Sequence, residues 1–305
     1  MNSRFREAPS PPGLHEHLGA SLKAQWKRCR KQLKRCQQEF SETAVHDLRV
    51  EIRRLLSNLE LLGAFVSEDR IEKARRLLKK RLAFLGELRD TQVQLLAVTE
   101  LARRFDSAKP FQARLIKREK RCTREARKRI QRIRPARLGR LIDGFREELR
   151  ARRRQRLGAQ DGAAVIRAVD RAFREVARLK ARRNAADTDT IHRTRIAFKR
   201  FRYMAEALAP LLPEVTKDRL AAMHEYQTIM GRIQDIEILS ENLDKFLAKE
   251  KRSFPDSRAL RAELRRERQA LIQACLKGAD QLHEFWPSPG SRKTTITIPT
   301  KEARS

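Results

Sequence analysis

The sequence predicts an all-α protein with long helices, arranged as two related four-helix bundles. Glycine and proline are scarce, at 11 each among 305 residues, while arginine, leucine, alanine, glutamate and lysine dominate. This composition favours helices over strands. Apolar residues recur at helical spacing, and two segments of the first half return in altered form in the second. We therefore expect an internal duplication and two pseudo-symmetric halves.

The longer repeat is a helix with two different faces. Residues 45–62 read VHDLRVEIRRLLSNLELL, and residues 191–208 read IHRTRIAFKRFRYMAEAL. The matching polar positions are His46 and His192, Arg49 and Arg195, Arg53 and Lys199, Arg54 and Arg200, and Glu60 and Glu206. Because a helix turns about 100° per residue, the histidine and the cations three and seven positions later share one stripe. The apolar residues fall on a separate face that we expect in the core: Leu48, Ile52, Leu55, Leu59 and Leu62, then Phe198, Phe201, Ala205 and Leu208.

A shorter repeat follows each copy of this helix at nearly the same distance. LGELRDTQV begins at Leu85, and MGRIQDIEI begins at Met230. Gly86 matches Gly231, and Asp90 matches Asp235. We interpret the glycines as positions of close helix packing, because no glycine-rich turn surrounds them.

Capping residues and prolines set the expected helix ends in the first half. Ser41 is a good N-cap for the first repeated helix. Pro110 opens a strongly basic helix, and Pro135 breaks it. The expected helices are about 14–40, 42–65, 68–105, 110–134 and 136–156.

The second half is read in the same way. Asp189 or Thr190 is the expected N-cap of the second repeated helix, and Pro210 with Pro213 ends it. The expected helices are about 163–183, 191–209, 214–249 and 256–285.

These boundaries predict the domain organisation. Residues 1–13 carry three prolines and form an expected flexible lead, and the polar residues 287–305 form an expected disordered tail. The first bundle covers about 14–156 and the second about 161–286. The glycine-containing stretch 157–162 is the predicted joint between them.

The charge balance limits the classes of partner. Lysine and arginine number 71 against 39 acidic residues, which gives a formal net charge of +32. Such an excess concentrates anions around the molecule. Nucleic acid, an anionic membrane surface and a small polyanion such as polyphosphate are the candidate partners.

The cysteines and the apolar runs indicate an intracellular protein. Cys29, Cys36, Cys122 and Cys275 have no metal-binding spacing, and we expect reduced thiols. No apolar run is long enough to cross a membrane, and no secretory signal opens the chain. The expected location is the cytoplasm, with association with polyphosphate granules as a further expectation.

The repeated motifs resemble those of the CHAD domain, the conserved histidine α-helical domain. The motifs are HxxRVxxRR from His46 and HxxRIxxKRxRY from His192, each followed by its glycine–aspartate segment. The resemblance covers about residues 14–285. It implies two four-helix bundles around a basic central channel that binds inorganic polyphosphate without catalysis.

The resemblance also implies which residues bind. Carried over by position, they are His46, Arg49, Arg53, His192, Arg195, Lys199, Arg202 and Tyr203, to which we add Arg54 and Arg89 as candidates. Leu56 departs from the pattern, because the family usually has a cation there and the second half keeps one at Arg202. The first half of the site is therefore expected to bind more weakly.

The chemistry of these residue types suits a phosphate chain. An arginine fork can give two parallel hydrogen bonds to phosphate oxygens, and lysine supplies a mobile point charge. Histidine gains a positive charge below its usual pKa of ~6.5. No cofactor and no metal site are expected, since no second His or Cys lies at ligand spacing.

Each feature also has a structural interpretation. A basic helical face is commonly a solvated surface, and His46 and His192 can be buried polar residues satisfied by neighbours. Glu60 and Glu206 are expected to pair with cations across the bundle. Asp90 and Asp235 either do the same or hold a divalent ion that accompanies phosphate.

Two further functions remain open at this point. RNA binding is the main alternative, although aromatic residues for base stacking make up only 6% of the chain. A phosphohydrolase or phosphotransferase would need clustered carboxylates or a positioned base and nucleophile. The repeated carboxylates are isolated in sequence, so we expect no enzyme activity.

Overall fold

The prediction of an all-α protein is confirmed. The computed structural model describes residues 13–154, 158–181, 188–250 and 254–286, and within these ranges it contains helices and no strand. The α-helices there are α1 Leu14–Gln38, α2 Glu42–Leu61, α3 Glu68–Ala102, α4 Lys109–Gln131, α5 Ala136–Arg154, α6 Gly158–Ala181, α7 Thr188–Leu208, α8 Lys217–Leu247 and α9 Ser257–Asp280. None of these helices has the length and apolar content that a membrane span requires.

Local signals explain several helix ends. The Ser41 side chain accepts a hydrogen bond of 3.2 Å from the backbone N–H of Ala44, as expected of an N-cap. Thr216 caps α8 in the same way through the N–H of Arg219, at 3.2 Å. Pro110 lies in the first turn of α4, where its missing N–H removes no intrahelical hydrogen bond.

Two predicted boundaries are wrong. The helix expected from about residue 163 begins at Gly158 instead, because Ala159, Ala163 and Ala164 favour a helix around Gly162. Helix α7 begins at Thr188, so Asp189 and Thr190 lie in its first turn instead of capping it. Apart from Gly13, the predicted lead 1–13 and the tail 287–305 lie outside the described residues.

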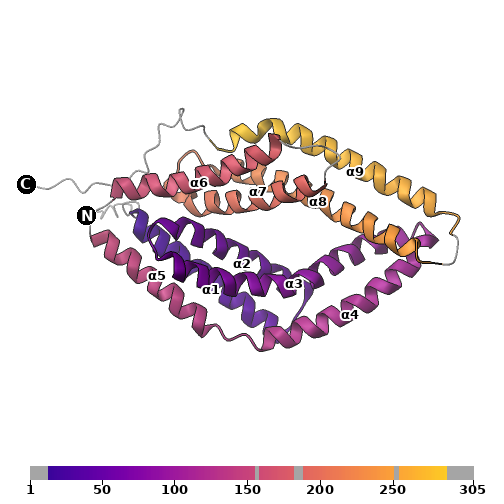
Figure 1. Cartoon of the computed structure of the whole chain (residues 1–305), viewed down its shortest axis with the longest axis horizontal. Coiled ribbons are helices and arrows are strands. Elements are labelled where there is room, and N and C mark those ends of the chain that lie inside the picture. The colour runs from indigo at the N-terminus through magenta and orange to yellow at the C-terminus, as the bar shows by residue number, and fades with distance from the viewer. Residues whose placement is uncertain (1–12, 155–157, 182–187, 251–253, 287–305) are drawn as a thin grey trace, which may run out of the picture.

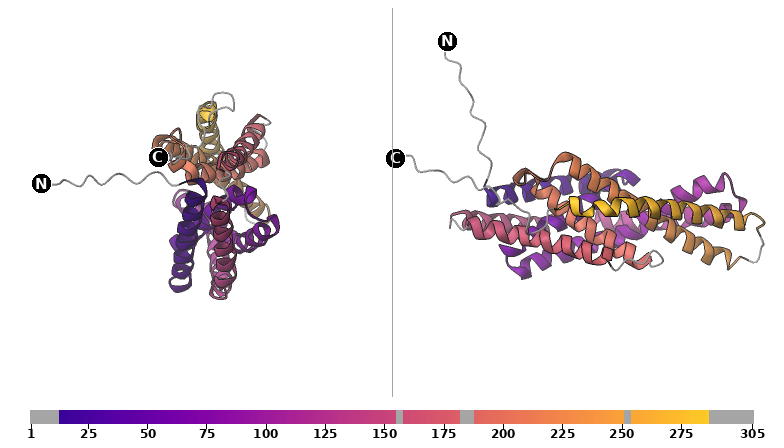
Figure 2. Two further views of the ribbon diagram at one scale, coloured as in Figure 1. Left: turned by 90° about the vertical axis from the view of Figure 1, so that its left-hand side faces the viewer. Right: turned by 90° about the horizontal axis from the view of Figure 1, so that it is seen from above.

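The helices form two layers that meet along the middle of the molecule (Figure 1). Within one layer α1 packs on α2 and α5, and α3 packs on α4; within the other α6 packs on α7, and α8 on α7 and α9. Helices α2 and α7, the repeated pair, contact each other between the layers. Viewed along the long axis, the two groups remain separate above and below this contact (Figure 2).

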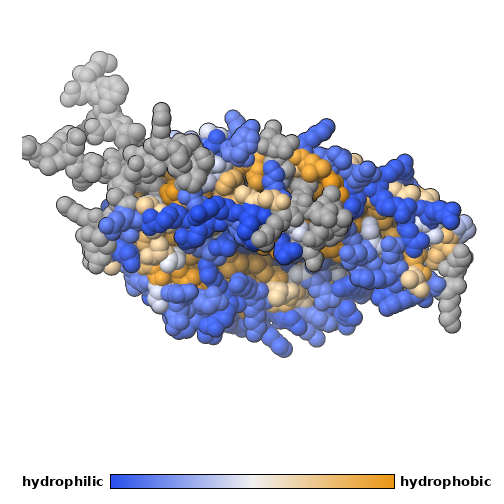
Figure 3. Space-filling view, turned by 45° about the horizontal axis from the view of Figure 1, so that its top comes forward, coloured by the Kyte–Doolittle hydropathy of each residue, from blue (hydrophilic) through white to orange (hydrophobic). Residues whose placement is uncertain are grey.

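A hydrophobic core supports both repeated helices. All nine apolar residues predicted for their inner faces are no more than 2% exposed. On the face shown in Figure 3, hydrophilic residues cover the outer helix surfaces, and hydrophobic residues show in the hollows between them. The core therefore fixes the rotation of α2 and α7 about their axes, and with it the direction of their polar stripes.

Reciprocal ion pairs join the two repeated helices. Arg54 of α2 pairs with Glu206 of α7 at 3.0 Å, and Arg200 of α7 pairs with Glu60 of α2 at 2.7 Å. Arg54 and Arg200 are repeat equivalents, as are the two glutamates. A two-fold relation produces such exchanged contacts, so they support the predicted duplication. The structural interpretation of Glu60 and Glu206 is correct.

Candidate functional site

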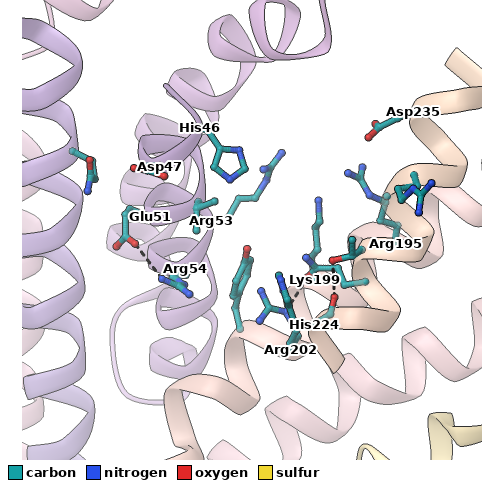
Figure 4. Close-up of a pocket in the computed structure, with 17 residues that line it drawn as sticks. His46, Asp47, Glu51, Arg53, Arg54, Arg195, Lys199, Arg202, His224 and Asp235 are labelled. Carbon is teal, nitrogen blue, oxygen red and sulfur yellow. Dashed lines mark hydrogen bonds and ion pairs between the residues drawn. The ribbon is translucent and has the colours of Figure 1, made fainter. Parts of the chain in front are cut away.

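A pocket of about 680 Å³ lies between α2, α7 and α8. In Figure 4 His46 and Arg53 of α2 lie across a common space from Arg195 and Lys199 of α7, and α8 adds His224 and Asp235. Seven of the ten predicted site residues line it, namely His46, Arg53, Arg54, Arg195, Lys199, Arg202 and Tyr203. The polar stripes of the two repeated helices thus share one cavity.

The arginines and lysine of these stripes fall into two groups. Arg54 and Arg202 form ion pairs, both with Glu206, at 3.0 and 3.4 Å. The second group has no ion pair among the described residues, and it consists of Arg49, Arg53, Arg195 and Lys199. In the two copies of the repeated motif, Arg49 matches Arg195 and Arg53 matches Lys199. Of the two paired arginines, Arg54 joins α2 to α7 and Arg202 pairs within α7, whereas the unpaired group leaves positive charge in and beside the pocket.

The surroundings of the unpaired cations disfavour their charged forms. Burial, together with repulsion from Arg195 and Arg53, lowers the pKa of Lys199 to about 6. Burial and nearby cations lower the pKa of Arg49 to about 10. Burial is also the largest cause of the lowered pKa values of Arg53 and Arg195. Buried cations without carboxylate partners are costly in the free protein and are frequent at binding sites.

The two glycines of the shorter repeat make room for two of these arginines. A Cβ atom at Gly86 of α3 would lie 3.6 Å from Nη1 of Arg49. A Cβ atom at Gly231 of α8 would lie 3.5 Å from Nε and Nη2 of Arg195. Each guanidinium therefore lies against a glycine of the next helix. This explains the close packing that the sequence predicts and links the two repeated motifs physically.

This contact predicts how the glycines respond to substitution. Gly86→Ala with Gly231→Ala should raise the unfolding temperature, because the added methyl groups meet the arginines at van der Waals distance and alanine favours a helix over glycine by about 1 kcal/mol per site. Gly231→Leu should lower it, because the larger side chain displaces Arg195. Thermal unfolding measures both. If the alanine and leucine variants were destabilised equally, the close contact between these glycines and the arginines would be contradicted.

Hydrogen bonds hold Arg49 and Arg195 in place. Arg49 donates from Nη1 to the carbonyl oxygen of Leu82 at 3.3 Å, and Arg195 donates from Nη1 to Oε1 of Gln234 at 2.8 Å. Gln234 also hydrogen-bonds the Nδ1 of His192. The predicted residues Arg49 and His192 thus support the site from beside it, since neither lines the pocket.

The remaining predicted residues differ in their surroundings. His46 lines the pocket, and burial and the neighbouring Arg89 lower its pKa. Arg89 itself does not line the pocket and pairs with Glu42 at 2.5 Å. Tyr203 is 7% exposed, and its ring faces the guanidinium of Arg202, 4.5 Å from the centroid. Leu56, where a cation was expected, packs against the core.

Carboxylates line part of the pocket without forming a metal cluster. Asp235 lines it, and burial is the largest cause of its raised pKa. Glu51 is buried, pairs with Arg54 at 3.2 Å and accepts from Gln25 at 2.5 Å. No group of three or more His, Cys, Asp or Glu side chains gathers at metal-binding distance in the part of the chain that the structure describes.

Helix α8 contributes lining residues that the sequence analysis missed. They are His224, Gln227, Thr228 and Arg232, and Gln32 of α1 joins them. His224, Thr228, Gly231 and Asp235 recur at steps of three and four residues, so the polar periodicity of α8 was the available signal. Of this helix, only Gly231 and Asp235 are matched positions of the repeated motifs.

Comparisons with known proteins agree with this geometry. The family model of the CHAD domain matches residues 20–244. A crystal structure of the CHAD domain from the plant Ricinus communis is 22% identical, with a TM-score of 0.64, and the match covers 93% of this chain and 96% of that one. PptA from Streptomyces chartreusis is 16% identical, with a TM-score of 0.65, over 88% and 100% of the two chains. These two likenesses show the fold alone. No curated protein matches the sequence.

Proposed function

Because the chain belongs to the CHAD domain family, we propose that its central pocket binds inorganic polyphosphate. The observation that carries this proposal is the unpaired group of cations, contributed equally by α2 and α7. Its members, Arg49, Arg53, Arg195 and Lys199, have lowered pKa values caused first by burial. A ligand with closely spaced negative charges would relieve both the desolvation and the mutual repulsion.

The shape of the pocket favours a chain of phosphate groups over a single phosphate ion as the ligand. The cations come from two helices on opposite sides of the cavity, so they can contact successive phosphate groups. Arg53 and Arg195 offer planar forks for pairs of phosphate oxygens, and Lys199 offers a mobile ammonium. Arg202 and Arg54 extend the positive lining on one side, although Glu206 neutralises part of their charge.

RNA is the alternative ligand, and the aromatic residues argue against it. Binding of single strands commonly uses exposed aromatic rings on which bases stack. Tyr203 is the aromatic residue among those that line the pocket, and it is buried beside Arg202. The pocket therefore presents charge without a stacking surface.

A competition measurement tests the proposal. Labelled long-chain polyphosphate is bound to the protein, and unlabelled polyphosphate or single-stranded RNA is added at equal phosphate concentration. We expect polyphosphate to displace the label and RNA to displace it far less. Binding should weaken steeply with salt, because a polyanion releases counterions when it is bound. Equal displacement by RNA would favour the alternative.

The proposed function is binding without catalysis. The described residues hold no group of three or more His, Cys, Asp or Glu side chains that could bind a catalytic metal ion. Release of orthophosphate from polyphosphate incubated with the protein and Mg²⁺ would contradict this part of the proposal. A cytoplasmic location near polyphosphate granules belongs to the same proposal.

A further inference from the structure

A second cationic pocket lies away from the central one, at the far end of the molecule. It has a volume of about 520 Å³ and lies where α4 meets the end of α8, at the right of Figure 1. Of the described residues, six cations line it and no carboxylate does: Arg114, Lys117, Arg118, Arg121, Lys245 and Lys249. Its other polar lining residues are Gln94 of α3 and Asn242 of α8, which hydrogen-bond each other at 2.9 Å.

Nearby carboxylates neutralise only part of this charge. Glu87 lies 3.2 Å from Arg118 and 3.7 Å from Arg121, and it is shared by both. Glu241 pairs with Lys245 at 3.5 Å. The remaining three cations have no ion pair within the described ranges; they are Arg114, Lys117 and Lys249. Arg114 lies over the ring of Phe246, 5.6 Å from its centroid. The pocket therefore keeps a positive excess.

A stripe of α8 connects the two pockets. Thr228 and Asp235 line the central pocket, and Asn242, seven residues further on, lines the second. Residues seven apart lie within about 20° of each other around a helix, and seven residues advance about 10 Å along it. Both pockets thus open along the same side of α8, at a separation that a flexible chain can cross.

We propose that this second pocket binds phosphate groups of a polyphosphate chain whose other end occupies the central pocket. The inference rests on the proposed function and adds a dependence on chain length. A chain held in the central pocket keeps its remaining phosphates at a high local concentration around Lys117 and Lys249, so their contacts add to the affinity. A short chain cannot use both pockets at once and lacks this gain.

The test compares long-chain polyphosphate with tripolyphosphate on the variant Lys117→Gln with Lys249→Gln. Both lysines are exposed, so the fold should be unaffected. The matched control is Lys79→Gln with Lys80→Gln, which removes the same charge from exposed positions of α3 outside both pockets. Calorimetric titration at several salt concentrations gives the affinity and its salt dependence.

For long chains, we expect the pocket variant to bind about tenfold more weakly than the control. Its slope of log affinity against log salt should fall by about 1 to 2, as expected for two lost phosphate contacts. Tripolyphosphate is expected to bind most tightly in the central pocket. Its affinity for that pocket should be the same in the pocket variant and in the control.

Identical long-chain affinities for the pocket variant and the control would overturn the inference while leaving the central site intact. An affinity loss confined to single-stranded RNA would overturn it in favour of nucleic acid. A wild-type protein that binds no polyphosphate at all would overturn the proposed function as well, so the two failures are distinguishable.

Discussion

Polyphosphate binding should take up about one proton per protein near neutral pH. In the free protein, burial and repulsion from Arg195 and Arg53 lower the pKa of Lys199 to about 6, so its amine is mostly neutral. A bound polyanion favours the charged form and raises this pKa toward the usual value of lysine. The affinity should therefore fall as the pH rises, by up to about tenfold per pH unit while one proton is coupled.

Calorimetry in two buffers of different ionisation enthalpy measures the proton uptake directly. The range from about pH 7 to 8.5 lies above the usual histidine pKa of ~6.5, so His46, whose pKa is lowered, contributes little. The matched variant is Lys199→Arg, because a guanidinium stays protonated throughout this range. The Lys199→Arg variant should still bind polyphosphate but take up no proton on binding. Equal uptake by both proteins would contradict the role of Lys199.

The same residue links stability to pH in the free protein. The pKa of Lys199 is about 6 in the folded protein, against 10.5 for an ordinary lysine. Folding therefore disfavours its protonated form, and stability is lost as the pH falls from about 10.5 toward 6. Lys199→Met should accordingly unfold at a higher temperature than the wild type near neutral pH, with a difference that shrinks as the pH rises toward 10.5.

Loss of Arg49 and Arg195 together should weaken polyphosphate binding by about a hundredfold or more. Each lies three residues after the histidine of its repeated motif, lies against a glycine and has no ion pair among the described residues. A hydrogen bond to a charged group contributes about 1.5–3 kcal/mol, so this factor is expected from the lost contact of Arg195 together with the positive charge that Arg49 supplies from beside the pocket. Titration of long-chain polyphosphate into Arg49→Ala with Arg195→Ala measures it.

The control for this variant removes two arginines elsewhere. Arg103→Ala with Arg178→Ala lowers the net charge equally, and both residues are exposed and paired only within their own helices, with Glu100 and Glu175. Its affinity should stay within a few-fold of the wild type, and circular dichroism should show the same helix content in all three proteins. Equal losses in the variant and the control would show that net charge alone determines binding.

The sequence could predict what depends on spacing along one helix. The apolar faces of the repeated helices, the Ser41 cap and the all-α class follow from residue type and the helical period, and the structure agrees with each. The shared cavity was implied only by the resemblance to the CHAD domain, because helical spacing does not decide whether two stripes face each other. Single glycines were weaker signals, and Gly158 and Gly162 lie within α6, although the helix was expected to begin only after them.

The sequence could not predict what depends on contacts between helices. Arg53 and Arg54 are adjacent in sequence, yet Arg54 pairs with Glu206 while Arg53 has no ion pair among the described residues. That difference arises from the distance between α2 and α7. Likewise, Arg89 looked like a site residue next to Asp90, but the position of α2 places Glu42 2.5 Å from it. Helix α8 enters the lining only through its packing on α7.

The central claim is that the unpaired cations of α2 and α7 bind one polyphosphate chain together. A crystal structure of the protein with polyphosphate tests it most directly. We predict phosphate groups in the central pocket, with oxygens of one chain within hydrogen-bonding distance of both Arg53 and Lys199. A chain that lies only on the outer surface of the basic helix α4, with the central pocket left without phosphate, would contradict the claim.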